Sequence, residues 1–246
     1  PPFQYDLQQV YSPPILPDLA SLLEQQTIPE AYQQCNDSFQ PGGESYAWRY
    51  LSSFLQNRSQ QYSRGLSKPT ISRTSCSRIS PYLAYGNISV RELYQHTARH
   101  AEQIRDDFHL PNFLTRLFWR SHYLQKLESG YHLEYEPINA GFQQLDRQTA
   151  GPLWEAFTEA RTGYPMVDAS IRCLQATGWV NFRMRAMLVT FASYALWLDW
   201  RSVAHFLAQL FLDFEPGIHS PQIQIRAGLT GYHTLMAKTT PHQYAS

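Results

Sequence analysis

Cysteine is scarce in this sequence, and no two cysteines lie close together. The chain of 246 residues has three, Cys35, Cys76 and Cys173, and none belongs to a C-x-x-C pair. A disulfide framework and a cysteine-based zinc site are therefore without support. Reduced thiols are instead typical of a protein that works inside the cell.

Long hydrophobic runs are missing as well. No apolar stretch approaches the roughly 18 residues that cross a membrane. The start, Pro1-Pro2-Phe3-Gln4, lacks the basic and apolar regions of a secretion signal. We expect a soluble, cytoplasmic protein with no membrane partner.

Neither sign of charge dominates. Twenty Lys and Arg residues balance twenty Asp and Glu residues, so the formal net charge is zero. The chain as a whole therefore carries no electrostatic footprint for nucleic acid or anionic lipid. Any nucleic-acid site has to be a local patch.

The motifs of several enzyme classes are also absent. The sequence has no G-x-S-x-G, no Walker A motif, no G-x-G-x-x-G and no H-E-x-x-H. Hydrolase, P-loop, Rossmann and zinc-protease functions are therefore without support. His96 and His100 are spaced four apart but lie on a polar stretch without an acidic third partner. We expect surface histidines there and no metal site.

Aromatic residues, by contrast, are abundant. Six Trp, sixteen Tyr and thirteen Phe make up 14% of the chain, and hydrophobic residues make up 43%. This content is typical of an aromatic core or a stacking pocket. The length suits one large domain or two small ones.

Helical periodicity dominates the chain after residue 41 and predicts an all-α fold, since no alternating strand pair is found. The proline-rich residues 1–41 indicate a linker or wrapping arm. Residues 62–86 are predicted to form a polar loop, and residues 213–246 to be mostly irregular. Helices are expected at Tyr46–Phe54, Val90–Ile104, Asn112–Leu127, Pro152–Ala160, Pro165–Ala176, Asn181–Trp197 and Trp200–Leu212.

A cluster of hydroxyl side chains lies between Thr70 and Pro81. Hydroxyls and unpaired backbone N–H groups at the start of a helix can bind an anion, because the helix dipole is positive there. A phosphate or pyrophosphate is one candidate ligand. Ordinary helix caps and turn residues are the alternative, which the sequence alone favours.

Two arginines, Arg183 and Arg185, begin an otherwise apolar helix. Residues two apart point to different sides of a helix. At least one of the two is therefore expected to meet a buried carboxylate or a ligand. Asp199, Asp213 and Glu215 are the candidate partners, and a solvent-exposed arginine is the alternative.

Several sequence blocks stand in a fixed order along the chain. They are P-G-G-E at 41–44, S-R-I-S-P-Y-L-A-Y-G-N-I-S at 77–89, L-F-W-R at 117–120, T-G-Y-P-M-V-D-A at 162–169, T-G-W at 177–179, R-M-R at 183–185 and L-D-W-R at 198–201. In order and spacing they resemble the helical FAD-binding domain of the photolyase and cryptochrome family, over residues 40–235.

The resemblance implies that FAD lies folded in a bowl of helices, at the bottom of a cavity that faces DNA. It also implies an ion pair between Arg185 and Asp213 over the flavin ring, with His219 in place of an asparagine beside the flavin N5. A positive or donating group there stabilises reduced flavin. The implied FAD-binding residues are Tyr62, Ser77, Arg78, Ile79, Ser80, Phe113, Arg116, Arg120, Trp179, Phe182, Arg185, Asp213, Glu215 and His219.

Electron transfer and DNA contacts are implied at further positions. Trp119, Trp200 and His219 are the candidate catalytic residues, for electron transfer or for tuning of the flavin. Trp119 and Arg183 are the candidate DNA contacts, by stacking and by pairing with phosphate. Single-stranded or damaged DNA is thus the candidate partner besides FAD.

The sequence also departs from the family pattern. Ile223 and Ile225 stand where the family has two tryptophans, one starting the electron-transfer chain and one stacking on the flipped lesion, and the outer tryptophan of the chain is lost near Arg147. Arg116 replaces a glutamate and Phe182 a polar asparagine in the pocket for a pyrimidine dimer. Because the polar edges of a flipped base need partners, these changes weaken dimer repair as well as photoreduction.

The leading hypothesis is a blue-light-absorbing FAD flavoprotein with an altered lesion pocket, in which residues 42–246 form the helical domain. The alternatives are a deoxyribodipyrimidine photo-lyase, a non-enzymatic signalling cryptochrome, and a helical binding module that has lost flavin. Retention of Ser77, Ser80, Arg185 and Asp213 argues against the last. The family's N-terminal α/β antenna domain is absent from the sequence, so a short family member and a fragment both fit.

Overall fold

The structure is a computed structural model that describes residues 37–106 and 108–230. The chain divides into two units, residues 1–37 and 38–246, and the described helices all belong to the second. Cys35 and nearly all of the expected arm lie outside the described residues. The domain boundary at residue 41 stays a prediction.

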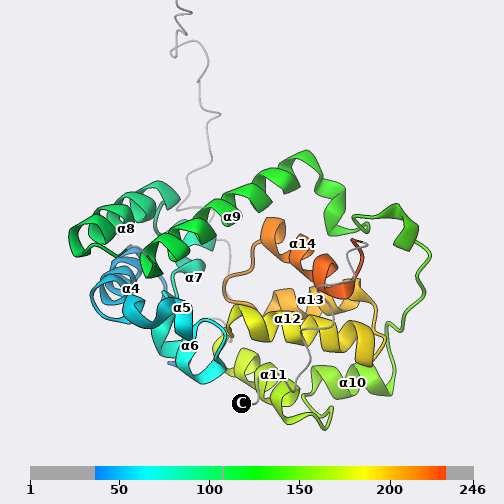
Figure 1. Ribbon diagram of the computed structural model, residues 1–246. Helices are drawn as coiled ribbons and strands as arrows, with labels where there is room; N and C mark the ends of the chain where they lie inside the picture. The colour runs from blue at the N-terminus through cyan, green and yellow to red at the C-terminus, as the bar shows by residue number, and fades with distance from the viewer. Residues whose placement is uncertain (1–36, 107, 231–246) are drawn as a thin grey trace, which may run out of the picture. The chain divides into compact units, whose positions relative to one another are not determined.

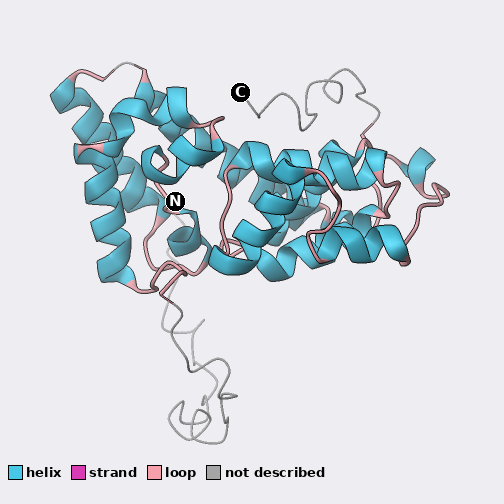
Figure 2. Ribbon diagram, turned by 90° about the horizontal axis from the view of Figure 1, so that it is seen from below, coloured by secondary structure: helices cyan, strands magenta, loops and turns pink. Residues whose placement is uncertain are grey.

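The described part of the chain is built from helices, which confirms the all-α class (Figure 2). A single bridge between Gln148 and Leu198 is the β-type pairing found there. No helix of the described residues is long and apolar enough to cross a membrane. The helices are α4 (Glu44–Gln56), η1 (Arg58–Gln61), α5 (Tyr62–Gly65), α6 (Pro69–Ser75), α7 (Ser80–Ala84), α8 (Val90–Ile104), α9 (His109–Ser129), η2 (Tyr131–Glu134), η3 (Ala140–Phe142), α10 (Pro152–Thr158), α11 (Pro165–Thr177), α12 (Phe182–Thr190), the π-helix η4 (Phe191–Ala195), α13 (Trp200–Leu210) and α14 (Pro216–Ala227).

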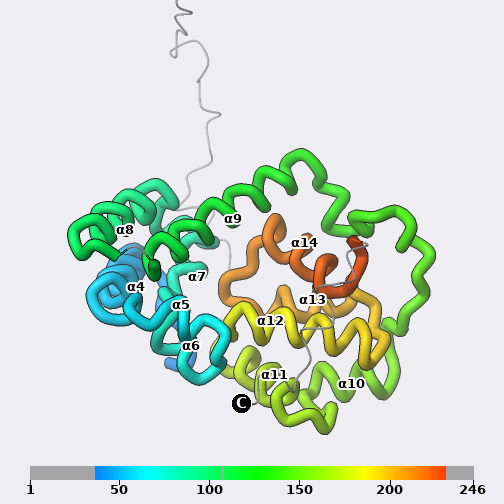
Figure 3. The backbone as a smooth tube through the Cα atoms, viewed as in Figure 1, coloured from blue at the N-terminus to red at the C-terminus, as the bar shows by residue number. Residues whose placement is uncertain are grey.

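Two apolar cores organise these helices. The N-terminal core lies among α4 to α9 and contains Leu51, Phe54 and Leu93, whereas the C-terminal core lies among α10 to α14 and contains Ile171 and Met187. Helix α9 packs against α8 at one end and against α14 at the other, so it belongs to both halves (Figure 1 and Figure 3). Residues that lie between the two cores are therefore positioned by helices from both halves.

Helix α8 shows how the sequence sets these elements. Ser89 caps its first turn by accepting a hydrogen bond from the backbone N–H of Glu92. Leu93, Thr97 and Ala101 recur every four residues, so they share one face and are buried. Each fully buried leucine contributes about 1.5–3 kcal/mol to stability. Capping and one apolar stripe thus suffice to define the helix, as expected from the sequence.

Two regions expected to be irregular are helical. The predicted loop 62–86 holds α5, α6 and α7, and the predicted irregular segment 213–246 holds α14. Pro221 lies inside α14 and breaks its bonding pattern. Contacts with α9, α12 and α13 compensate, and the buried Gln224 side chain bonds the backbone of Leu133, Glu136 and Ile138. Tertiary contacts of this kind are invisible in a local pattern, which is why the prediction was wrong there.

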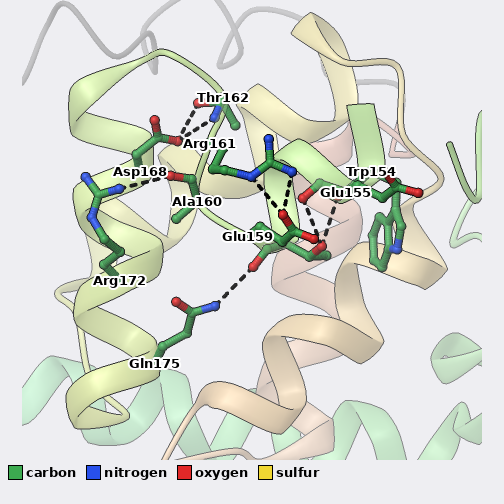
Figure 4. Close-up of polar contacts among 10 residues, drawn as sticks. Trp154, Glu155, Glu159, Ala160, Arg161, Thr162, Asp168, Arg172 and Gln175 are labelled. Atoms are coloured by element: carbon green, nitrogen blue, oxygen red, sulfur yellow. Dashed lines mark hydrogen bonds and ion pairs between the residues drawn. The ribbon is translucent and has the colours of Figure 1, made fainter. Parts of the chain in front are cut away.

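Asp168 fixes the turn that precedes α11 (Figure 4). Its carboxylate accepts hydrogen bonds from the Thr162 backbone and hydroxyl, at 2.9 and 2.6 Å, and from the Gly163 backbone at 3.1 Å. Pro165 then occupies the first helical position, where no N–H is needed. The longest of the sequence blocks therefore serves to start a helix of the C-terminal core.

Candidate functional site

Polar side chains from both halves meet between the two apolar cores. We call the set Ser80, Arg120, Arg185, Asp213 and Glu215 the polar seam. These residues come from α7, from α9, from α12 and from the segment that joins α13 to α14. Ion pairs and hydrogen bonds among them connect helices of the N-terminal half with helices of the C-terminal half.

Asp213 is the centre of the polar seam. Its carboxylate accepts hydrogen bonds from Arg185 at 2.9 and 3.1 Å and from the Ser80 hydroxyl at 2.6 Å. The Asp213 side chain is 7% exposed and that of Arg185 is 23% exposed. Burial alone would raise the pKa of Asp213, but Arg185 and Ser80 lower it below its ordinary value. Asp213 is therefore an anion at neutral pH, as the sequence argument required of a partner for Arg185.

The guanidinium of Arg185 is held on several sides. Its Nε donates to the Val180 carbonyl at 3.0 Å, and its plane lies 4.3 Å from the ring centroid of Phe211. With both terminal nitrogens on Asp213, its orientation is fixed. A fixed, partly buried cation is suited to bind an anionic or electron-rich ligand.

A second ion pair crosses the polar seam. Arg120 on α9 donates to Glu215 at 2.9 Å and to the Leu83 carbonyl at 3.2 Å. The two charged side chains are 15% and 21% exposed. Glu215 precedes the first residue of α14, so this pair ties α9, α7 and α14 together.

Two glycines allow the close approaches that the polar seam needs. A Cβ on Gly217 would come within 2.9 Å of the Leu124 side chain and 3.1 Å of its Cα, so α14 packs on α9 without a side chain at this point. Gly178 has φ +66°, and a Cβ there would lie 2.9 Å from Leu212. Both positions therefore require glycine, and they bring Glu215 to Arg120 and Asp213 to Arg185.

The segment that follows α6 carries the predicted FAD residues Ser77 to Ser80. Arg58 holds this segment by donating to the carbonyls of Cys76 and Ser77. Gln40 donates to the Arg78 carbonyl at 2.6 Å, and Arg78 itself has φ 59°. Such a conformation is strained for a non-glycine residue and is maintained here by the bonds on both sides. The Arg78 guanidinium lies 4.2 Å from the ring centroid of Trp179, another predicted FAD residue.

Tyr62 begins α5 and packs in the N-terminal core. Its ring contacts Phe113 edge-on, with centroids 5.7 Å apart. Burial raises the pKa of Tyr62 to about 12, and the neighbouring Arg116 opposes that shift. The phenol is therefore a neutral donor. Ile79, another predicted FAD residue, is buried in the same core.

His219 does not supply a positive charge. Its Nε2 is 2.9 Å from the Ala204 carbonyl, and its ring packs edge-on against Phe211 and Phe214. Burial, helped by nearby Arg185, lowers the pKa of His219 to about 4. The imidazole is neutral at pH 7. The sequence allowed either a positive charge or a hydrogen-bond donor at this position, and the positive charge does not fit.

Other predicted residues make their contacts outside the polar seam. Trp119 is 50% exposed and stacks on Tyr123 of its own helix. Arg183 is exposed and reaches the Ser67 hydroxyl at 3.4 Å, and the exposed Phe182 packs under Arg226. The DNA-binding role proposed for Trp119 and Arg183 stays a prediction.

The positions expected to carry electrons are buried or altered. Trp200 is 3% exposed and belongs to the same C-terminal core as Ile223. Arg147 is 9% exposed, and its guanidinium lies 4.8 Å from the ring centroid of Trp197 and 5.7 Å from that of Tyr194. A cation against these rings disfavours removal of an electron from them.

Two residues that cap helices were not predicted from the sequence as structural residues. Asn181 caps α12 and donates to Ser72 of α6 at 3.0 Å, which joins the two halves. Its place before a helix marks the cap, but nothing in the sequence indicates the contact with Ser72. Asp199, a candidate partner for the arginines, instead caps α13 and pairs with Arg201 at 3.5 Å.

Metal ligands do not gather in the described residues. No group of three His, Cys, Asp or Glu side chains that could hold a metal ion is found in 37–106 or 108–230. Cys76 and Cys173 are both free thiols.

A family model described as the FAD-binding domain of DNA photolyase matches residues 113–244. Among curated proteins, a deoxyribodipyrimidine photo-lyase of Alkalihalophilus pseudofirmus is 30% identical over 190 residues, which is 75% of this chain and 37% of that protein. The chloroplastic and mitochondrial cryptochrome DASH of Arabidopsis thaliana is 29% identical over 143 residues, which is 56% of this chain and 24% of that protein.

Solved structures agree with the fold. A bacterial class III photolyase from Agrobacterium tumefaciens superposes with a TM-score of 0.75 and 25% sequence identity, over 88% of this chain and 44% of that one. The chain therefore spans less than half the length of the proteins that it matches.

Proposed function

Because this chain belongs to the FAD-binding domain family of DNA photolyases, with FAD as its cofactor, we propose that it is a blue-light-absorbing flavoprotein whose polar seam and Ser77–Ser80 segment hold FAD. The observation that carries the proposal is the bidentate pair of Arg185 and Asp213, joined to Ser80 across the two halves. Such a pair is costly to bury for stability alone.

The donors present suit this cofactor. The pyrophosphate needs N–H and O–H donors, and Ser77, Ser80 and the Arg78 side chain offer them on one short segment. The Nε of Arg78 is buried and has no hydrogen-bond partner, which is the state expected of a donor reserved for a ligand. Trp179 and Tyr62 add aromatic surface next to these donors.

When bound, FAD supplies blue-light absorption and one-electron transfer. The protein's part is to bind and to orient. Asp213 keeps Arg185 in position, and a flavin bound there would meet a fixed positive charge that stabilises its reduced form. Neutral His219 adds no second cation, so its part is limited to packing and to one hydrogen bond.

The content and spectrum of the bound chromophore test this proposal. The purified protein should show flavin absorption in the blue, and denaturation should release FAD. Ser80→Ala removes one hydroxyl from the polar seam and should weaken FAD binding roughly tenfold, since a hydrogen bond to a charged group contributes about 1.5–3 kcal/mol. Ser129→Ala, at the exposed end of α9, is the matched control. A protein without flavin, or equal affinity in both variants, would contradict the proposal.

We also propose that the chain binds DNA but repairs cyclobutane dimers poorly. Arg116 is exposed beside Tyr62, and Phe182 presents an exposed ring where a polar partner for the base is needed. Each missing hydrogen bond to a flipped base costs about 1–3 kcal/mol, so even one such loss lowers the preference for a dimer by about one to two decades. Trp119 keeps an exposed stacking surface, and this favours photolyase activity as the alternative.

A light-dependent repair assay distinguishes a chain with an altered lesion pocket from an active photolyase. We expect slow repair of a thymine-dimer oligonucleotide with reduced FAD present. The double variant Arg116→Glu, Phe182→Asn should raise dimer binding relative to undamaged DNA at least tenfold, because it restores polar partners. Efficient repair by the parent chain would establish a deoxyribodipyrimidine photo-lyase and overturn the altered-pocket proposal.

Light-driven reduction of the flavin is expected to be slow. Ile223 offers no oxidisable ring, and Arg147 sits against Trp197, so Trp200 is the remaining donor of the expected route. Trp200→Phe should abolish what photoreduction there is, as followed by transient absorption. Fast formation of a tryptophan radical that Trp200→Phe leaves unchanged would exclude this route.

A further inference from the structure

A cavity of about 620 Å³ lies outside the polar seam, among α4, η1 and α6. Four arginines line it, Arg49, Arg58, Arg73 and Arg78, together with the rings of Tyr46 and Tyr50. We call it the arginine pocket. Its volume falls in the range of pockets that bind small molecules and cofactors.

No aspartate or glutamate lines the arginine pocket, and none of the four arginines is in an ion pair within the described residues. The carboxylate that acts on Arg78 is Asp213 of the polar seam, which lies outside the lining. Burial lowers the pKa of Arg78, and the neighbouring charge of Arg73 lowers it further. Like charges this close repel each other, so a bound anion would remove an unfavourable interaction.

The four arginines of the pocket differ in what they already contact: Arg58 is structural, Arg78 is shared with the proposed FAD site, and Arg49 and Arg73 are available. Arg58 is fully used, because it donates to Ser53 and to the backbone carbonyls of Tyr50, Cys76 and Ser77. Arg49 makes no hydrogen bond to the described residues and lies 5.4 Å from the ring centroid of Tyr46.

Arg73 also has donors to spare. It reaches only the weak acceptor Sγ of Cys173, at 3.4 Å. Arg78 lines the cavity, but its free Nε is assigned to the FAD site. Arg49 and Arg73 therefore bring to the cavity guanidinium donors that no described oxygen acceptor uses, which is the pattern of an anion site.

We propose that the arginine pocket binds a nucleoside di- or triphosphate, at a site separate from the flavin. Its phosphates match Arg49 and Arg73, and its base matches the ring of Tyr46, which is 37% exposed next to those charges. One exposed ring, that of Tyr46, beside one cluster of arginines suits a single nucleotide, whereas a strand needs repeated stacking sites along its backbone. Among the predicted FAD residues, Arg78 alone lines this cavity, so the two sites share one wall.

Calorimetric titration of the full, flavin-loaded chain tests the proposal. ADP should bind at low salt while the flavin spectrum stays unchanged. Pyrophosphate should bind at least tenfold more weakly, because it lacks a base to stack on Tyr46, and adenosine should not bind measurably. Arg49→Ala and Arg73→Ala should each weaken ADP binding at least tenfold. Both arginines are exposed, and Arg91→Ala, an exposed arginine on α8, is the matched control.

Several outcomes would overturn the proposal. Release of flavin by ADP would show that the cavity belongs to the flavin site. Equal affinity for pyrophosphate and ADP would reduce it to a simple anion site. A duplex oligonucleotide that binds through Arg49 and is not displaced by ADP would make this face a nucleic-acid interface. Absence of ADP binding would exclude the site, and because the flavin is measured separately, this failure is distinct from failure of the proposed function.

Discussion

The polar seam and the arginine pocket use the same side chain in opposite ways. In the polar seam Arg185 faces Asp213 and Arg120 faces Glu215, and each pair is largely buried. In the arginine pocket four arginines gather without a carboxylate. The charges of the seam are balanced within the protein and help to join the two halves, whereas the pocket has no carboxylate in its lining. The partners of an arginine therefore decide whether it also carries part of the stability of the fold.

The two regions also differ in what a mutation should do. A buried charge that loses its partner destabilises the fold, because desolvation is no longer compensated. An arginine that has no partner loses nothing in the folded protein when it is removed. Mutations in the seam should therefore lower stability as well as FAD affinity, and mutations in the pocket should lower ligand affinity alone.

Removal of the Asp213 carboxylate should have the largest effect. Asp213→Ala leaves Arg185 without an anion, at about 3 kcal/mol of folding free energy, which lowers Tm by roughly 6–12 °C in a domain of this size. FAD binding should be lost as well. Thermal melts with flavin quantitation measure both effects. Unchanged melting and FAD affinity would show that the pair of Arg185 and Asp213 supports neither the fold nor the flavin site.

Acid should lower the stability of the folded chain through His219, which lies near Arg185 and Asp213 of the polar seam. The pKa of His219 is lowered from 6.5 to about 4 in the folded protein, so the unfolded chain binds the proton more tightly. The stability that depends on neutral His219 is present above pH 6.5 and is lost as the pH falls toward 4. The loss between pH 7.5 and pH 5 should be about 2 kcal/mol.

Urea unfolding at the two pH values measures this loss. His219→Gln should remove most of the difference, since glutamine does not titrate. Asp213 serves as an internal reference, because its pKa lies below the ordinary 3.8 and its contribution is lost only at still lower pH. A parent protein equally stable at pH 7.5 and pH 5 would mean that His219 is already exposed to solvent.

A carboxylate added to the arginine pocket should make it resemble the polar seam. Ser53 lines the cavity and is exposed, so Ser53→Glu places an anion among the arginines. Stability should rise by about 0.3–1 kcal/mol, the range of partly exposed pairs, while ADP binding is lost. Ser52→Glu, one residue away and also exposed, controls for the added charge. Retained ADP binding in Ser53→Glu would place the anion elsewhere.

The smallest effect is expected for an exposed pair. Arg161 and Glu159 are in contact, as Figure 4 shows. Their side chains are 63% and 56% exposed. Solvent screens such pairs, so Glu159→Ala should cost 0–1 kcal/mol. A loss as large as that of Asp213→Ala would show that burial is not what separates the two pairs.

Some of the candidate site could be predicted from the sequence. An arginine on an apolar helix needs a buried anion, and this argument named Asp213 and Glu215 among its candidates; both take part in ion pairs of the polar seam. It could not assign the partners, since the carboxylates are near each other in sequence and their arginines lie on different helices, α9 and α12. It did not find the role of Arg58 either, which depends on backbone carbonyls.

The sequence by itself determined the helical class, the apolar faces of helices such as α8 and the family of the chain, because periodicity, caps and ordered motifs are local properties. Tertiary structure alone decided that α14 is a helix despite Pro221, that His219 is neutral, and that four arginines converge around one cavity. Each of these depends on the distance between residues far apart in the chain. Burial and Coulomb energy are set by that distance and not by sequence order.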